Sequence, residues 1–509
     1  ALNQQQTEAL NSVASWLAKP IDPIKGNPCY TLVGYAGTGK TTIMRVLLEY
    51  ILKNTGIKAK QIALVSPTNK AASVLSSVTD FPAFTIHALL GLSPTINIDE
   101  YKHNEIITST EFSAGRRNNM LKKKLVIIDE VSMVNDDLFK DLITIAREHQ
   151  IKLLTVGDKA QLQPVKQNRV GLAFFNPMNY ALTKVERQKG ANPLLPFLDY
   201  IRSIFTSNPD NISEYNYKSE FDHMSNLNEN GNGILFVSNS QNNQFLQSIA
   251  DTFNTELAKQ NNNYVKTLAW TNKRVNEINA YVRSKLGYTD HFNPNEPITM
   301  YDTIELDEND YLFNSMDYSI ESSEPTEKYI PFLGISLQGY NVKVKLGDSY
   351  VSKPIFVVTD DTKGSEIAEI INNKLINLYQ TEPSKRDIKL FFDTVKDSFY
   401  STFDMVTSTG RVIKKKTLDY GYASTVHKSQ GSTYNIVFVD EADINKNNSP
   451  RNRSQLKYTA FSRASESAVV LTNNNILPGN VNNEIDEFNK RKFNIGEFDD
   501  SIMKHCKGE

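Results

Sequence analysis

Cysteine is almost absent from this chain, since only Cys29 and Cys506 occur among its 509 residues. So few cysteines exclude a disulfide framework and a cysteine-based zinc site, and they favour a reducing, cytoplasm-like compartment. Long apolar runs are also missing, because none approaches the ~20 residues that span a bilayer. The first residues lack the basic and apolar regions of a secretory signal peptide. We therefore expect a soluble, cytoplasmic protein.

An excess of positive charge is missing as well. The 56 lysines and arginines stand against 58 acidic residues, which gives a net charge of −2. Without a global basic field, a nucleic-acid partner would have to lie in a local groove. The lysine triplets at 122–124 and 414–416 are local basic clusters, although such clusters are more typical of solvated faces. No tandem repeat is visible, which excludes a solenoid, and the length predicts several domains.

Residues 34–41, Gly-Tyr-Ala-Gly-Thr-Gly-Lys-Thr, form a complete phosphate-binding loop between a predicted strand at 30–33 and a predicted helix. In such a loop backbone N–H groups surround the phosphates, Lys40 reaches the β/γ-phosphates and the Thr41 hydroxyl ligates Mg²⁺. The alternative, a glycine-rich turn with an exposed lysine, is disfavoured by the flanking elements. The loop therefore predicts a nucleoside triphosphate site. The apolar face of the helix would consist of Ile43, Val46, Leu47, Tyr50 and Ile51.

Two later strand ends carry groups suited to phosphoryl transfer. The run 126–130, Val-Ile-Ile-Asp-Glu, places Asp129 to hold Mg²⁺ and Glu130 to polarise the attacking water. A further strand leads into a loop with Asp158 and Gln161, whose amide can orient water beside the γ-phosphate. Asp158 has an alternative interpretation as a structural cap. Because ligands of open parallel sheets collect at the carboxyl ends of strands, these residues should meet the phosphate loop.

Strands and helices alternate from 29 to about 180, which predicts a parallel sheet with crossover helices. The stretch 93–120 interrupts this alternation and could form a hairpin with arms at 95–99 and 105–109. Buried strands are predicted at 62–66, 125–128 and 153–156, with a crossover helix at 138–146.

A second alternating block begins near Ile234, is interrupted at 300–408 and resumes at Thr425. The interruption mixes strand-like runs with helical ones, which predicts a small domain inserted into the second block. In the second block we expect a helix at 245–257 and a strand at 265–270; in the interruption we expect strands at 341–346 and 354–358 and helices at 365–379 and 387–400.

Taken together, these motifs resemble superfamily 1B DNA helicases of the RecD and phage Dda branch, and most of all a Dda-type helicase. The resemblance runs from about residue 2 to 467, without the two interruptions. The segments that carry it, besides the phosphate loop, are 66–72 (Ser-Pro-Thr-Asn-Lys-Ala-Ala), 85–87 (Thr-Ile-His), 129–133 (Asp-Glu-Val-Ser-Met), 157–165 (Gly-Asp-Lys-Ala-Gln-Leu-Gln-Pro-Val), 183–188 (Thr-Lys-Val-Glu-Arg-Gln), 269–276 (Ala-Trp-Thr-Asn-Lys-Arg-Val-Asn), 421–433 (with His-Lys-Ser-Gln-Gly) and 457–464 (with Phe-Ser-Arg-Ala).

The resemblance implies an α/β fold with two tandem RecA-like, parallel-sheet, P-loop motor domains, each with an inserted subdomain. The first insert would be a β-hairpin pin and the second an SH3-like β-barrel. The implied boundaries are 1–190 for the first motor domain, with the pin at 93–120; 191–233 for a connector; 234–299 and 409–490 for the second motor domain; 300–408 for the barrel; and 491–509 for a C-terminal tail.

The resemblance also implies site residues. The catalytic residues would be Lys40, Glu130, Gln161 and two arginines at the γ-phosphate, Arg187 and Arg463. ATP would contact Gln6, Gly37, Thr38, Gly39, Lys40, Thr41, Thr42 and Gly431, and Mg²⁺ would contact Thr41 and Asp129. DNA would contact Pro67, Thr68, Asn69, His87, Gln163, Trp270, Thr271, Asn272, Thr425, His427 and Lys428, although Trp270 could equally be core packing and His87 a capped loop residue.

The function implied is that of an ATP-dependent 5′-3′ helicase, a monomer acting on single-stranded DNA and duplex junctions, in a host cytoplasm if a phage encodes it. Replication or recombination proteins would be further partners. The alternatives are an RNA or RNA–DNA translocase, an ATP-gated binding switch and a small-molecule kinase. The intact set Glu130, Gln161, Arg187 and Arg463 disfavours a switch, and the second block disfavours a kinase.

Overall fold

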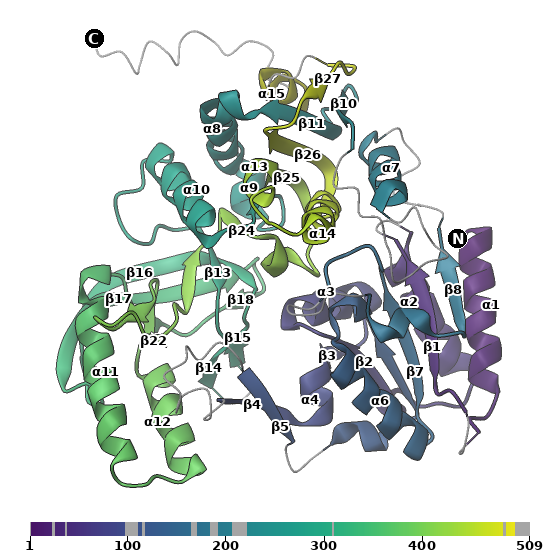
Figure 1. Cartoon of the computed structure of the whole chain (residues 1–509), viewed down its shortest axis with the longest axis horizontal. Helices are drawn as coiled ribbons and strands as arrows, with labels where there is room; N and C mark the ends of the chain where they lie inside the picture. The colour runs from purple at the N-terminus through teal and green to yellow at the C-terminus, as the bar shows by residue number, and fades with distance from the viewer. Residues whose placement is uncertain are drawn as a thin grey trace.

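The computed structural model describes residues 2–22, 26–35, 38–96, 110–114, 118–163, 170–183, 192–205, 221–307, 310–481 and 485–493. It contains two modules built on parallel sheets and a third module inserted into the second (Figure 1). No helix within these ranges is long and apolar enough to cross a membrane.

The first module is a six-stranded sheet in the order β3-β2-β6-β7-β1-β8, with every neighbouring pair parallel. The four predicted buried strands are confirmed, and they read as unbroken apolar runs because helices cover both faces of the sheet. The strands are β1 (Cys29–Gly34), β2 (Ile62–Ser66), β3 (Ala83–Thr85), β6 (Leu125–Ile128), β7 (Lys152–Gly157) and β8 (Asn179–Leu182); the helices are α1 (Gln4–Ala18), α2 (Lys40–Asn54), α3 (Asn69–Thr79), α4 (Ile86–Leu90) and α6 (Asp136–Glu148).

The buried face of α2 differs from the predicted one. Tyr50 is exposed and Val46 is only half-buried, whereas Met44 and Leu48 join the core. The reason is that α2 packs against α1 and α3 as well as the sheet, so its apolar stripe is wider and rotated. The complete buried set is Ile43, Met44, Leu47, Leu48 and Ile51.

A hairpin of β4 (Leu92–Ile96) and β5 (Thr110–Ala114) leaves the first module after α4. Thr95 pairs with Glu111, so the described strands extend beyond the predicted arms at 95–99 and 105–109. Residues 97–99 of the first predicted arm and all of the second lie outside the described residues.

The second module repeats the architecture with the order β10-β11-β26-β25-β12-β24, in which β10 alone is antiparallel to its neighbour. Its predicted helix at 245–257 ends at Phe253, and Leu257 lies exposed on a separate short helix. The strands are β10 (Asn226–Leu227), β11 (Gly233–Ser238), β12 (Val265–Ala269), β24 (Ala423–Thr425), β25 (Tyr434–Asp440) and β26 (Ala464–Thr472); the helices are α7 (Leu194–Phe205), α8 (Asn242–Phe253), α9 (Glu256–Gln260), α10 (Asn272–Lys285), α13 (Glu441–Ile444), α14 (Pro450–Phe461) and α15 (Ile485–Phe493).

Part of the stretch predicted as a connector belongs to this second module. Leu194, Phe197 and Ile201 of α7 lie in the same buried cluster as Phe236 and Phe461. Their helical spacing buries one face of α7 against the sheet. The first part of 191–233 therefore forms core.

The inserted module is a mixed sheet that runs from β13 to β23, residues 297–420, and is thus wider than the predicted 300–408. Its order, β20-β19-β17-β16-β13-β23, runs between two edge strands, and two helices accompany it. This is an open sheet, whereas the prediction was an SH3-like barrel. The elements are β13 (Pro297–Met300), β16 (Asp317–Ile330), β17 (Ile335–Leu346), β18 (Tyr350–Val351, on β17), β19 (Ile355–Val358), β20 (Tyr400–Ser401), β23 (Leu418–Tyr420), α11 (Gly364–Tyr379) and α12 (Lys385–Ser398), with small ribbons β14–β15 (Ile304–Asp307, Asp310–Leu312) and β21–β22 (Met405–Val406, Val412–Lys414).

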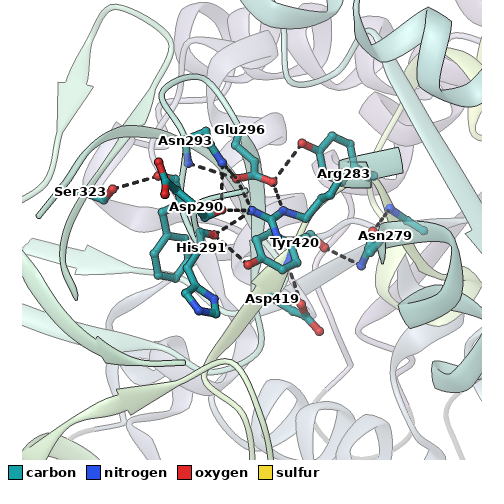
Figure 2. A network of polar contacts seen from close by, with 12 residues as sticks. Asn279, Arg283, Asp290, His291, Asn293, Glu296, Ser323, Asp419 and Tyr420 are labelled. Atoms are coloured by element: carbon teal, nitrogen blue, oxygen red, sulfur yellow. Dashed lines mark hydrogen bonds and ion pairs between the residues drawn. The ribbon is translucent and has the colours of Figure 1, made fainter. Parts of the chain in front are cut away.

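A polar network joins the inserted module to the second module at α10 (Figure 2). Arg283 of α10 pairs with the buried Glu296, which also accepts a hydrogen bond of 3.1 Å from the Tyr422 hydroxyl. Asn279, one turn earlier, donates to the Tyr420 carbonyl at 2.9 Å. The insert is therefore anchored by buried charge and hydrogen bonds at its point of origin.

Candidate active site

A cavity of about 560 Å³ lies between the first and second modules. It brings together most of the predicted nucleotide residues, from elements far apart in the chain. Gly37 and Arg187 lie outside the described residues. Its lining comprises Gln6, Gly39, Lys40, Thr41, Thr42, Asp129, Glu130 and Gln161, four residues of α3, and Gly431, Ser432, Thr433, Ser462 and Arg463 from the second module.

The phosphate loop and α1 fit closely. Gly39 caps α2 with φ of 78°, a left-handed conformation that favours glycine, and a Cβ there would lie 2.5 Å from Gln6 Nε2. The Gln6 amide donates to the Thr38 carbonyl at 3.2 Å and accepts from the Asn3 backbone N–H at 3.0 Å. This capping box at the start of α1 fixes Gln6 beside the loop.

Lys40 is the first residue of α2 and points back into its own loop. Its Nζ donates to the carbonyls of Gly34 at 2.8 Å and Tyr35 at 3.1 Å. Both are neutral acceptors, and charge-assisted bonds to phosphate oxygens are stronger. The ammonium is therefore held at the site with bonds that an anion can replace.

Two carboxylates, Asp129 and Glu130, follow β6 and line the cavity. Glu130 adopts φ of 51° and ψ of 43°, a left-handed conformation that is strained for a non-glycine residue and recurs at functional sites. Its Oε2 is buried without a hydrogen-bond partner in the described parts of the chain. Burial, with the charge of Glu130, raises the pKa of Asp129 well above its ordinary value, although Lys40 opposes the shift. Such crowded, buried carboxylates suit a divalent cation, so the residues present fit Mg²⁺ at Asp129 and Thr41.

The loop that carries Gln161 is tied to α14 of the second module. Asp158 accepts from the Ala160 N–H at 2.9 Å, which bears out its interpretation as a cap, and also from the Tyr458 hydroxyl at 2.9 Å. The Leu162 N–H donates to Thr459 Oγ1 at 3.1 Å. Sequence reasoning assigned no role to Tyr458 and Thr459, although they lie within the 457–464 segment that contains Arg463.

Gln161 itself lines the cavity, and its Oε1 is buried without a partner among the described residues. Gln163, predicted to contact DNA, is used otherwise. Its amide donates to the Gln161 carbonyl at 3.1 Å and accepts from the Gly171 N–H at 3.2 Å, and it is buried. The placement makes Gln163 a support of the Gln161 loop.

Arg463 reaches the same cavity from the second module. The guanidinium donates to the carbonyls of Thr459 at 3.2 Å and Ser432 at 3.1 Å, and to Ser462 Oγ at 3.3 Å. Within the described ranges no carboxylate forms an ion pair with it. A buried, uncompensated positive charge therefore faces the cavity that holds Lys40 and Glu130.

Gly431 of the second module lies against α3 of the first at the cavity. Its φ is 76°, and a Cβ there would lie 2.7 Å from the Cβ of Ala71 on α3. Both the backbone conformation and the contact require glycine.

A groove of about 780 Å³ lies between the first and inserted modules. One wall contains the predicted DNA contacts Pro67, Thr68, Asn69 and His87. The opposite wall contains the 414–416 triplet, which sequence reasoning had favoured as a solvated face. Lys414 is occupied there, because its Nζ donates to the carbonyls of Val395, Lys396 and Phe399 at the end of α12, whereas Lys415 is exposed.

Lys428 lies against Tyr301, which lines the wall of the groove formed by the inserted module. Its Nζ lies 4.0 Å from the centre of the Tyr301 ring, and Lys416 lies 4.5 Å from the same ring. Burial, together with the charge of Lys416, lowers the pKa of Lys428 to about 8.

The other predicted DNA contacts of the second module do not line the groove. Trp270 packs against the core, which favours the alternative interpretation. The Thr271 hydroxyl bonds to Asp443 at 3.0 Å, and Asn272 lines a separate hollow beside α10. Thr425 is buried, and burial lowers the pKa of His427, as it does that of His87.

Known proteins resemble this chain in the same segments. Residues 1–195 match the family model described as an AAA domain, and residues 420–471 match that of a UvrD-like helicase C-terminal domain. The ATP-dependent DNA helicase dda of Enterobacteria phage T4 is 24% identical over 80% of this chain and 87% of its own length. An uncharacterized protein, R530 of Acanthamoeba polyphaga mimivirus, is 25% identical over 86% of this chain and 94% of its own.

Among solved structures, a Pif1 helicase from Bacteroides in complex with ADP-AlF3 and ssDNA is 16% identical, with a TM-score of 0.48 over 97% of this chain and 99% of that one. The two family models match the segments that contain the phosphate loop and the 421–433 motif. With the near full-length similarity to Dda, they show that the chain resembles the superfamily 1B helicases of the Dda, RecD and Pif1 branch.

Proposed function

We propose that this protein is an ATP-dependent 5′-3′ DNA helicase that translocates on single-stranded DNA and separates duplexes. The observation that carries the proposal is the shared cavity, in which Arg463 of the second module faces Lys40 and Glu130 of the first. An arginine finger at the γ-phosphate is worth roughly 10³ to 10⁵ in rate. Hydrolysis therefore requires the modules to close on each other, and product release lets them open, which is the motor stroke.

The residues predicted to bind and hydrolyse ATP have the following roles in this proposal. Lys40 and the loop residues Gly37 to Thr42 bind the phosphates, Gln6 lies beside the base, and Gly431 completes the second-module wall. Thr41 and Asp129 hold Mg²⁺, which when bound neutralises charge on the β- and γ-oxygens. Glu130 takes the proton of the attacking water and Gln161 orients it. Arg187 is the second arginine of the set.

The groove is proposed as the track for the single strand. Pro67, Thr68, Asn69 and His87 offer backbone contacts on one wall, and Lys415 offers positive charge on the other. Such contacts hold the phosphate backbone without reading bases. The contacts of Trp270, Thr271, Asn272, Thr425, His427 and Lys428 remain proposals, as do cytoplasmic action on duplex junctions, a monomeric state, the hairpin as a wedge and partners from replication or recombination.

The test is ATP hydrolysis with and without single-stranded DNA, followed by strand displacement from duplexes with a 5′ or a 3′ tail. We expect strong stimulation by DNA and displacement from the 5′-tailed duplex only. Lys40→Ala should abolish hydrolysis and so exclude a contaminating ATPase. Stimulation by DNA without strand displacement would identify an ATP-gated switch. Equal stimulation by RNA would identify a translocase that acts on both nucleic acids, and turnover that DNA does not stimulate would identify a kinase.

A further inference from the structure

A buried cluster of charges joins all three modules. Asp317 of β16, in the inserted module, lies 2.7 Å from Lys70 Nζ on α3 of the first module and 2.9 Å from Lys266 Nζ on β12 of the second. The Tyr434 hydroxyl of β25 donates to Asp317 at 3.1 Å and accepts from Lys70 at 3.1 Å. All three charged side chains are almost fully buried.

The charges of this cluster depend on one another. Burial opposes ionisation of Asp317, but Lys266 and Lys70 outweigh it and lower the pKa of the carboxyl. Burial also disfavours charge on Lys70, but Asp317 outweighs it and raises the pKa of the amine. Removing Asp317 would leave two buried cations unpaired, which is costlier than breaking a surface pair.

Lys70 stands on a helix that touches both functional sites. Thr68 and Asn69, at the start of α3, line the groove. Ala71, Val74 and Val78 line the ATP cavity. An 11-residue helix of about 16 Å moves as one body. A displacement of α3 at the groove therefore reaches the cavity and Gly431, which lies against Ala71.

The inserted module contributes both to the groove and to the buried charge cluster. Tyr301 and Lys416 belong to its wall of the groove, while Thr299 pairs with Asp317 across β13 and β16. A strand seated in the groove thus presses on α3 and on the inserted module together. The Lys70–Asp317 contact is the buried link between these two walls.

We propose that Lys70 and Asp317 are positioning residues that couple occupation of the groove to closure of the ATP cavity. This inference rests on the proposed function, because it presumes that the groove holds the strand and the cavity holds ATP. Neither residue lines the cavity or the groove. Both act through the placement of α3 relative to Arg463.

The experiment compares Asp317→Asn with Asp307→Asn in steady-state ATPase assays with and without oligo-dT. Asp307 is a matched control, because it pairs with Lys353 in the same module but on the surface. Asp317→Asn should lower the stimulation of kcat by DNA about 5- to 150-fold, the usual range of coupling between sites. Basal kcat and the KM for ATP should change less than about twofold, and Asp317→Glu should restore part of the stimulation. Asp307→Asn should resemble the wild type.

Lys70→Met is the second variant, because it leaves Asp317 paired with Lys266 and keeps the test open if Asp317→Asn does not fold. Thermal unfolding establishes that each variant is folded. The inference is overturned if folded Lys70→Met is stimulated like the wild type, or if basal and stimulated kcat fall equally. A wild type that DNA does not stimulate would reject the proposed function instead.

Discussion

The two sheet modules have matching strand orders, β3-β2-β6-β7-β1-β8 and β24-β12-β25-β26-β11-β10. The matched strands β6 and β25 both lead into Asp-Glu, at Asp129–Glu130 and at Asp440–Glu441. In the first module Glu130 Oε2 has no partner among the described residues. In the second, Arg274 pairs with Asp440 at 2.6 Å, so the same two residue types are neutralised.

Glu441 shows the contrast most clearly. His223 and Lys457 each lie 2.8 Å from its carboxylate, inside the core of the second module. Burial opposes ionisation of Glu441, but the hydrogen bond from His223 and the charge of Lys457 outweigh it and lower its pKa. Ion pairing, and not the residue pair itself, distinguishes the Asp-Glu pair of the second module from the one at the proposed catalytic site.

The strands β2 and β12 extend the comparison to the groove. Each is followed by Thr-Asn-Lys, at 68–70 and at 271–273. Both threonines cap the helix that follows them. They differ in their second contact, because Thr68 lines the groove whereas the Thr271 hydroxyl donates to Asp443.

The largest effect should follow from removing Arg463, the proposed arginine finger of the second module. Arg463→Ala should lower the DNA-stimulated kcat about 10³-fold or more while ATP still binds, because its charge matters most in the transition state. Arg463→Lys should recover little, since an ammonium cannot reproduce the guanidinium's fork. Single-turnover hydrolysis and binding of a fluorescent ATP analogue measure the two quantities. An active Arg463→Ala would make the second module dispensable for chemistry.

Glu130 and Glu441 test the comparison directly. Glu130→Gln should lower kcat about 10²- to 10⁴-fold and leave ATP affinity nearly unchanged, because it removes the group that takes the proton of the water. Glu441→Gln, in the matched position, should retain turnover. Steady-state ATPase with saturating DNA makes the measurement. Loss of turnover in both variants would mean that the two pairs do not differ in role.

Much of the first module could be predicted from the sequence, because local patterns determine it. The phosphate loop, Asp129–Glu130 and Gln161 follow strands whose apolar runs are visible without a structure. The contacts that complete the site are different. Tyr458 with Asp158, and Gly431 with Ala71, join residues about 300 or more positions apart and leave no local pattern.

Intramolecular bonds of predicted DNA contacts are equally invisible in the sequence. Gln163 and Thr271 have polar side chains at strand ends, as DNA contacts do, but they also bond to Gly171 and Asp443. Periodicity places a residue on a face and cannot show what that face meets. The motif around Arg463 is local in sequence, and the structure places this residue at the cavity beside the first module, where its catalytic role stays a prediction.

The effects of the two substitutions on stability should rank in the opposite order to their effects on turnover. Glu441→Gln should lower the free energy of unfolding by about 3–5 kcal/mol, because Lys457 and His223 would keep their burial and lose their charged partner. Glu130→Gln should change it by no more than about 1 kcal/mol, since Glu130 has no such partner. Guanidinium unfolding followed by fluorescence gives both values. Equal losses would show that Glu130 is as structural as Glu441.

The smallest expected effect is on DNA affinity and concerns Lys416 and Lys428, which both lie over the Tyr301 ring. Lys416 pairs with Asp419, whereas Lys428 forms no ion pair within the described chain and lies over the Tyr301 ring. With a pKa of about 8, Lys428 is mostly charged at pH 7 and mostly neutral at pH 9. Phosphate binding favours the charged form. Affinity for single-stranded DNA should therefore fall as the pH rises through 8, by about threefold to tenfold for one phosphate contact.

Lys428→Arg separates this titration from others, because a guanidinium stays charged throughout the range. The groups facing Lys428 are Lys416 and Lys70, which lower its pKa, and Asp317 and Asp302, which oppose them. None of these has an ordinary pKa near 8, so the slope between pH 7 and 9 should flatten in Lys428→Arg. Fluorescence anisotropy with oligo-dT at constant ionic strength measures it. If the affinity of Lys428→Arg depended on pH as that of the wild type does, another group would be titrating and Lys428 would not contact the DNA.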